Sequence, residues 1–250
     1  MTIRNSQVLL ARRPQGVAVP EDFDIVQTAV PEPGKGQFLA RTVYLSLDPY
    51  MRGRMNAERS YAEPVPIGGV MEGGTVSQVV ASNHPGLNVG RYVVGRTGWQ
   101  EYAVSAGTGM RQIAPEHAPP STARGILGMP GMTAYTGLLN IGQPKQGETL
   151  VVAAASGAVG SAVGQIGRIK GCRVVGIAGG PDKCRYVTEE LGFAACLDHP
   201  DPDFEAELAA ACPDGIDIYF ENVAGHVLRT VIPHFNFFAR MPVCGLIAQY

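Results

Sequence analysis

Residues 149–171, TLVVAAASGAVGSAVGQIGRIKG, hold the pattern that decides the fold. An apolar run ends at a turn rich in glycine, and a segment with helical spacing of apolar residues follows directly. A strand that leads through such a turn into a helix is typical of a dinucleotide-binding domain, although Ala155 replaces the first glycine of the strict motif. We expect Gly157 and Gly160 to let the backbone approach a pyrophosphate at the helix N-terminus.

The second strand of this pattern, residues 172–178, indicates which dinucleotide is bound. It ends at Gly179, where an NAD site carries the carboxylate that binds the ribose hydroxyls. Lys183 stands just beyond, in place to contact a 2′-phosphate, or it is a solvated lysine in the first turn of a helix. Asp182 is a rival ligand for a ribose hydroxyl, but we expect it to cap that helix. The missing carboxylate favours NADPH over NADH.

Strands and helices alternate from residue 148 onward, as in βαβ units with a parallel sheet. The predicted strands are TLVVAAA (149–155), CRVVGIAG (172–179), AACLDH (194–199), IDIYFENV (216–223) and MPVCGLI (241–247). The predicted helices cover residues 159–170, 182–191, 204–211 and a stretch after Gly225. This half of the chain is therefore expected to be a doubly wound Rossmann domain.

The front of the chain has a different pattern. Residues 7–111 contain short apolar runs broken by turn residues, such as FLARTVYLSLDPY (38–50) and GGVMEGGTVSQVVAS (68–82). Glycines inside strand patterns mark bulges and close backbone approach, so we expect a small β-barrel. The pattern changes at the Pro-Pro-Ser-Thr sequence of residues 119–122, which predicts a substrate domain over residues 1–122 and a nucleotide domain over residues 123–250.

Composition limits the partners of the protein. Lys and Arg number 20 against 22 Asp and Glu, and no cluster of like charges occurs, so neither nucleic acid nor an anionic membrane surface is an expected partner. The most apolar stretch, residues 150–167, contains four glycines, which favours a strand-turn-helix over a membrane span. Small molecules are the expected partners.

Cysteine usage and the N-terminal sequence indicate the compartment. The first residues lack the long apolar segment of a signal peptide. Five cysteines, an odd number, all follow residue 170 and match no disulfide framework or CxxC motif. A cytoplasmic location is therefore expected.

Three further motifs carry a family resemblance. YLSLDPYMRGRM (44–55), GMPGMTAYTGLL (128–139) and VCGLIAQY (243–250) occur in this order around the glycine-rich turn. Together with IDIYFENVAG (216–225) they resemble the zinc-independent medium-chain dehydrogenases/reductases, in the branch of the prostaglandin and curcumin reductases. The resemblance extends over almost the entire chain.

The resemblance implies an N-terminal GroES-like β-barrel domain, a Rossmann domain and homodimers. It implies NADPH as the cofactor and an α,β-unsaturated ketone or aldehyde as the substrate, whose C=C bond is reduced. The cofactor-binding residues that it implies are Met132, Thr133, Gly157, Ala158, Val159, Lys183, Asn222, Cys244 and Tyr250. Asn222 is retained although this chain has Glu-Asn-Val-Ala-Gly at residues 221–225, where the family has Asp-Asn-Val-Gly-Gly.

Tyrosines are the candidate catalytic residues. Hydride delivered to the β-carbon of an enone leaves negative charge on the carbonyl oxygen, which needs a hydrogen-bond donor but no metal. Tyr50 and Tyr61 follow strand-like segments where the resemblance implies the substrate entrance, and Tyr250 ends a Rossmann segment. Tyr50 and Tyr61 are alternatively ordinary surface or core tyrosines. Cys244 is interpreted as a small buried apolar group, and His199 as a polar loop residue or a contact of the adenosine ribose.

Two expectations concern what the chain lacks. No cysteine precedes Cys172, so the residues offer no catalytic zinc ligands of the usual kind, and we expect no metal. Family members extend beyond the equivalent of Tyr250, so the Rossmann sheet and the barrel are expected to be C-terminally incomplete, with an apolar sheet edge. A quinone oxidoreductase and a non-catalytic nucleotide-binding fragment therefore remain alternative functions.

Overall fold

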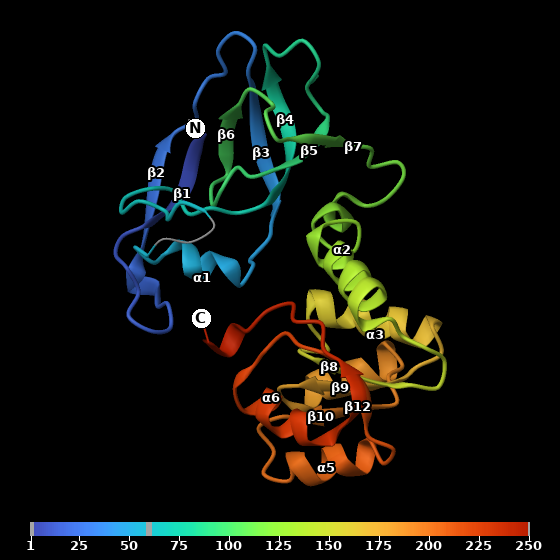
Figure 1. Ribbon diagram of the computed structural model, residues 1–250. Helices are drawn as coiled ribbons and strands as arrows, with labels where there is room; N and C mark the ends of the chain where they lie inside the picture. The colour runs from blue at the N-terminus through green and yellow to red at the C-terminus, as the bar shows by residue number, and fades with distance from the viewer. Residues whose placement is uncertain (1–2, 59–61, 250) are drawn as a thin grey trace. The chain divides into compact units, whose positions relative to one another are not determined.

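A computed structural model of the chain describes residues 3–58 and 62–249. The chain divides into two compact units, Met1–Arg124 and Gly125–Tyr250 (Figure 1). No helix within the described ranges combines the length and the apolar character that crossing a membrane requires.

The first unit is built from antiparallel strands. A five-stranded sheet has the order β6-β3-β4-β5-β7, and β1 pairs with β2 in a separate two-stranded sheet. The β-rich front half is thereby confirmed. The elements are β1 Arg4–Leu10, β2 Phe23–Ala29, β3 Phe38–Leu45, α1 Tyr50–Arg54, β4 Thr75–Ser82, β5 Tyr92–Gly95, β6 Tyr102–Ser105 and β7 Arg111–Ile113.

The second unit is a parallel sheet of five strands in the order β10-β9-β8-β11-β12. Numbered within the unit, this is the order 3-2-1-4-5 of a Rossmann domain, which confirms the predicted α/β fold. The elements are α2 Met129–Thr136, β8 Thr149–Ala153, α3 Ala158–Ile169, β9 Arg173–Ala178, α4 Pro181–Arg185, β10 Ala195–Asp198, α5 Phe204–Ala211, β11 Ile216–Phe220, α6 Gly225–Val231 and β12 Phe235–Arg240. Two π-helical turns, Gly137–Gly142 and Tyr186–Glu190, extend α2 and α4.

Successive residues of β8 point to opposite faces of this sheet, and both faces are covered. Leu150 and Val152 belong to the core beneath α2 and α3, whereas Val151 and Ala153 belong to the core beneath α5 and α6 (Figure 1). All five residues of β8 are buried, because helices exclude water from both sides. The apolar run that opened the sequence pattern is therefore the central strand.

Glycines on the inner face of α3 bring this helix close to the sheet. A Cβ atom at Gly164 would overlap the ring of Phe193, and one at Gly167 would overlap the side chain of Leu150. Both glycines are buried, and α3 carries its exposed residues on the opposite face. Close approach of the helix therefore depends on the absence of side chains at these positions.

The last predicted strand was wrong in position. The fifth strand is Phe235–Arg240, and residues 241–247 contribute one isolated bridge between Glu221 and Val243. Pro242 has no N–H to donate to a ladder, and only its carbonyl oxygen is used, by the amide of Glu221 at 3.0 Å. The side chains of Phe237 and Phe238 in the edge strand β12 are 98% and 95% exposed.

Substitution Gly164→Ala should destabilise the second unit by about 1–3 kcal/mol, because the new methyl group must displace the buried ring of Phe193. Thermal unfolding followed by circular dichroism measures the effect. Gln165→Ala, on the exposed side of the same helix, is the control and should change stability by less than about 0.5 kcal/mol. Equal stability of the two variants would contradict the close packing of α3.

Candidate functional site

The turn between β8 and α3 presents uncapped amides. Gly157 is the N-cap residue of α3, and no side chain accepts a hydrogen bond from the first turn of this helix. The amides of Ala158, Val159 and Gly160 therefore lie at a helix N-terminus without a protein side chain to accept from them. This arrangement suits a phosphate group, since the helix dipole and the free amides both favour negative charge.

The same turn has no room for side chains at its glycines. A Cβ atom at Gly160 would overlap the carbonyl oxygen of Ala154, and one at Gly157 would lie 3.1 Å from that oxygen. Gly157 is exposed, whereas Gly160 is buried against the strand end. These residues fit a dinucleotide pyrophosphate, because the bare backbone can be approached closely from the exposed side.

The strand order reverses direction between β8 and β11, which is where ligands bind in sheets of this type. Asn222 follows β11, and its side-chain amide donates a hydrogen bond to the carbonyl oxygen of Ala153 at 2.8 Å. Asn222 therefore joins the ends of the two strands that border this crevice. The structure brings Asn222 and the glycine turn together at the carboxyl ends of the parallel strands β11 and β8.

The end of β9 carries the predicted 2′-phosphate region. His199 follows β10, and its Nε2 atom would lie 3.1 Å from a Cβ atom placed at Gly179. The pKa of His199 is lowered, first by burial of the ring and then by the neighbouring His226, so the imidazole is neutral at pH 7. His199 lies in a turn after β10, as expected of a polar loop residue, and its proximity to Gly179 was not predicted from the sequence.

Lys183 lies on α4 and is exposed. The prediction that Asp182 caps this helix was wrong: the N-cap residue is Gly180, and Asp182 lies inside α4, paired with Arg185 at 2.9 Å. Gly180 has a φ of 91°, which aspartate rarely adopts, and this explains why the helix begins after a glycine. The ammonium group of Lys183 is thus available to an anion.

Thr133 and Cys244 line one cavity of about 250 Å³, whose wall includes Phe220 and Pro242. The prediction that Cys244 is buried was wrong, because the residue is exposed. Met132 lies on α2 and is 63% exposed. The structure therefore groups Thr133 with Cys244, beside the end of β11.

Of the three candidate tyrosines, Tyr61 and Tyr250 lie outside the described residues. Tyr50 opens α1 rather than lying in a loop, and the guanidinium of Arg54 stands 5.7 Å from the centre of its ring. Burial raises the pKa of Tyr50, and the nearby Asp48 carboxylate raises it further. The phenol hydroxyl can donate a hydrogen bond.

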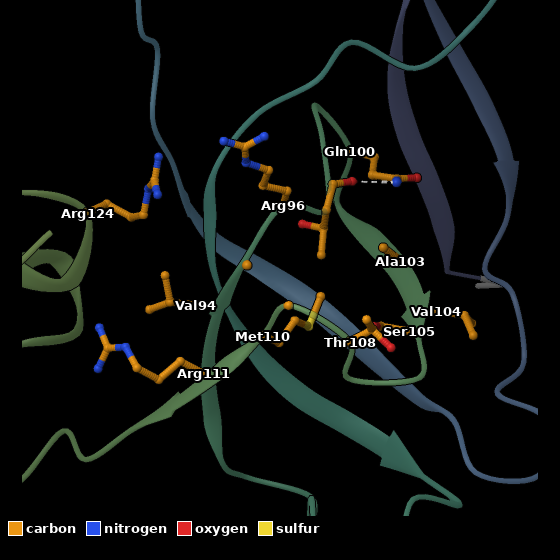
Figure 2. A pocket seen from close by; sticks show the side chains of 13 residues that line it. Val94, Arg96, Gln100, Ala103, Val104, Ser105, Thr108, Met110, Arg111 and Arg124 are labelled. Carbon is orange, nitrogen blue, oxygen red and sulfur yellow. Dashed lines mark hydrogen bonds between the residues drawn. The ribbon is translucent and has the colours of Figure 1, made fainter. Parts of the chain in front are cut away.

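A cavity of about 550 Å³ in the first unit was not predicted from the sequence. Figure 2 shows Arg96, Arg111 and Arg124 around Val94, on its wall. Arg124 also contacts the Asp48 carboxylate at 3.4 Å. None of the predicted site residues that the structure describes lines this cavity, so its positive charge is a separate feature of the unit.

In residues 3–58 and 62–249, no three histidine, cysteine, aspartate or glutamate side chains are grouped so that they could hold a metal ion. The described residues therefore do not fit a zinc site.

Two family models match the chain. Residues 6–113 match a model described as the N-terminal domain of oxidoreductase, and residues 158–250 match one described as zinc-binding dehydrogenase. Within the part of the chain that the structure describes, no cluster of three metal-ligating side chains accompanies the second match.

Curated relatives agree with these models. The chain is 60% identical over 247 residues to the NADPH-dependent curcumin reductase of Escherichia coli, covering 99% of this chain and 72% of the relative. It is 41% identical to the NADP(+)-dependent 2-alkenal reductase of Nicotiana tabacum, covering 99% of this chain and 74% of that enzyme.

A solved structure has a similar fold. CurA from Vibrio vulnificus in complex with NADPH is 57% identical, with a TM-score of 0.93 over 98% of this chain and 73% of CurA. The chain therefore belongs to the medium-chain dehydrogenase/reductase family, in the branch of the curcumin, 2-alkenal and prostaglandin reductases.

Proposed function

We propose that this protein uses NADPH to reduce the C=C bond of α,β-unsaturated ketones or aldehydes. The observation that carries the proposal is the 60% identity to a curcumin reductase, which extends over 99% of the chain. The uncapped amides at the start of α3 and the crevice between β8 and β11 supply a place for the dinucleotide in the second unit.

The proposed cofactor contacts are made by residues at the carboxyl ends of the parallel strands. The amides at Gly157, Ala158, Val159 and Gly160 would hold the pyrophosphate, and Gly179 with Lys183 would receive the 2′-phosphate ribose. Nearer the centre of the sheet, Asn222 and the cavity residues Thr133 and Cys244 would contact the nicotinamide half. The further candidate contacts are Met132 and Tyr250.

The proposed reaction also needs a side chain that stabilises the charge formed on the substrate by hydride transfer. When bound, NADPH supplies the hydride to the β-carbon of the substrate. The negative charge then appears on the carbonyl oxygen, where a hydrogen bond from a tyrosine hydroxyl stabilises it until the α-carbon takes up a proton from water. Tyr50, at the start of α1, is the candidate donor that the structure describes. Tyr61 and Tyr250 are the other candidate donors.

Two properties accompany this function. We infer a homodimer, on the basis of the resemblance to the reductase branch. We also infer a cytoplasmic location, since all five cysteines are free thiols and no pair of them forms a disulfide in the described part of the chain.

The purified protein should oxidise NADPH in the presence of hydrophobic enones and enals, and the product should be the saturated ketone or aldehyde. NADPH absorbance and mass spectrometry of the product measure the two halves of the reaction. A parallel series of benzoquinones is the control. Faster turnover of the quinones would indicate a quinone oxidoreductase, and NADPH binding without turnover of either series would indicate a non-catalytic protein.

Substitution Lys183→Ala should raise the dissociation constant of NADPH about tenfold and leave that of NADH unchanged within about twofold, because only NADPH carries the 2′-phosphate. Fluorescence of the bound nicotinamide measures both constants. Lys170→Ala, an exposed lysine at the far end of α3, should change neither constant. Equal losses of affinity for NADPH and NADH would show that Lys183 does not bind the 2′-phosphate.

A further inference from the structure

Glu221 is a fully buried carboxylate at the end of β11, with 0% of its surface exposed. Among the described residues no lysine, arginine or histidine forms an ion pair with it. A buried charge without a partner of opposite sign is strongly unfavourable unless hydrogen bonds replace its hydration shell. The contacts of this side chain therefore indicate what it does.

Three donors surround the carboxylate. Oε1 accepts hydrogen bonds from the backbone amides of Val223 and Ala224, the latter at 2.9 Å. Oε2 accepts a hydrogen bond from the hydroxyl of Tyr219 at 3.0 Å. Two of the three bonds hold the backbone of the loop that immediately follows, so the side chain fixes the path of its own chain.

That loop has a backbone conformation that needs support. Ala224 has a φ of 66° and a ψ of −149°, a region essentially restricted to glycine. Residues in such conformations persist only when surrounding contacts determine them. The bond from the Ala224 amide to Glu221 is such a contact, and it stabilises the strained turn before α6.

The fixed loop carries Asn222, whose side-chain amide bonds to the carbonyl oxygen of Ala153 at 2.8 Å. The backbone of Glu221 also holds the segment after β12. Its amide donates to Pro242 at 3.0 Å, and its carbonyl oxygen accepts from the amide of Cys244 at 2.9 Å. Glu221 therefore connects the crevice loops with the segment that contains Cys244.

We propose that Glu221 is a positioning residue for cofactor binding at the crevice between β8 and β11: its carboxylate holds the loop that carries Asn222, and its backbone holds the segment that carries Cys244, without touching the cofactor. This inference rests on the proposed function, because Asn222 and Cys244 are cofactor contacts there. It assigns the buried carboxylate to the nicotinamide half of the site, whereas Lys183 on α4 belongs to the adenosine half.

The test compares Glu221→Ala with Glu221→Gln, which keeps an acceptor oxygen for the amides of Val223 and Ala224. The dissociation constants of NADPH and of adenosine 2′,5′-bisphosphate are measured by calorimetry. Glu221→Ala should raise the dissociation constant of NADPH about tenfold and that of the bisphosphate less than about threefold. Glu221→Gln should retain most of the NADPH affinity.

A matched control separates positioning from general stability. Leu208→Ala removes a fully buried side chain from the core on the α5 face, so it should lower the unfolding temperature without changing either dissociation constant. If Glu221→Ala alone does not fold, both Glu221 variants are made in an Ala224→Gly background, where glycine tolerates the backbone conformation of the turn.

Wild-type affinity of a folded Glu221→Ala protein for NADPH would overturn the inference. Equal losses for NADPH and the bisphosphate would also overturn it, because a purely structural role weakens both halves alike. A different result would contradict the proposed function: NADPH binds and the Glu221 variants lower its affinity as expected, but no enone is reduced.

Discussion

The close packing of α3 against the parallel sheet is the constraint on which the nucleotide end of the second unit depends. Gly164 and Gly167 leave no side chains between the helix and the residues beneath it, and Gly160 meets the carbonyl oxygen of Ala154 directly. The N-terminus of the helix is therefore held at the end of the central strand. The contacts that pack the core thus also leave amide donors exposed toward an anion.

The loops that border the crevice beside that helix are fixed by side-chain contacts. Chain segments leave β8 and β11 toward opposite faces of the sheet, so the loops at their ends diverge. Asn222 joins them through the carbonyl oxygen of Ala153, and Glu221 fixes the loop that carries Asn222. Two neighbouring polar residues therefore act on the crevice in different ways: one bridges its sides, and the other is buried beneath it.

Local patterns predicted the parts of the fold that depend on neighbours in sequence. The helix at residues 204–211 has the bounds that its periodicity indicated, and the strand before Gly157 is the buried central strand. Features that depend on distant contacts were not predictable in this way. The pairing of residues 235–240 with β11 is a contact between distant segments, and the cavity at Arg96, Arg111 and Arg124 joins three separate segments.

Two residues with an unusual backbone conformation lie beside the same crevice. Four non-glycine residues in the described part of the chain have a positive φ, and two of them, Ala154 and Ala224, lie just after β8 and β11. Ala154 accepts a hydrogen bond from the amide of Gly157 at 2.9 Å, and Ala224 donates one to Glu221. Both strained loops are thus fixed by contacts within the protein. A ligand in the crevice would meet loops already ordered, so less conformational entropy is lost on binding.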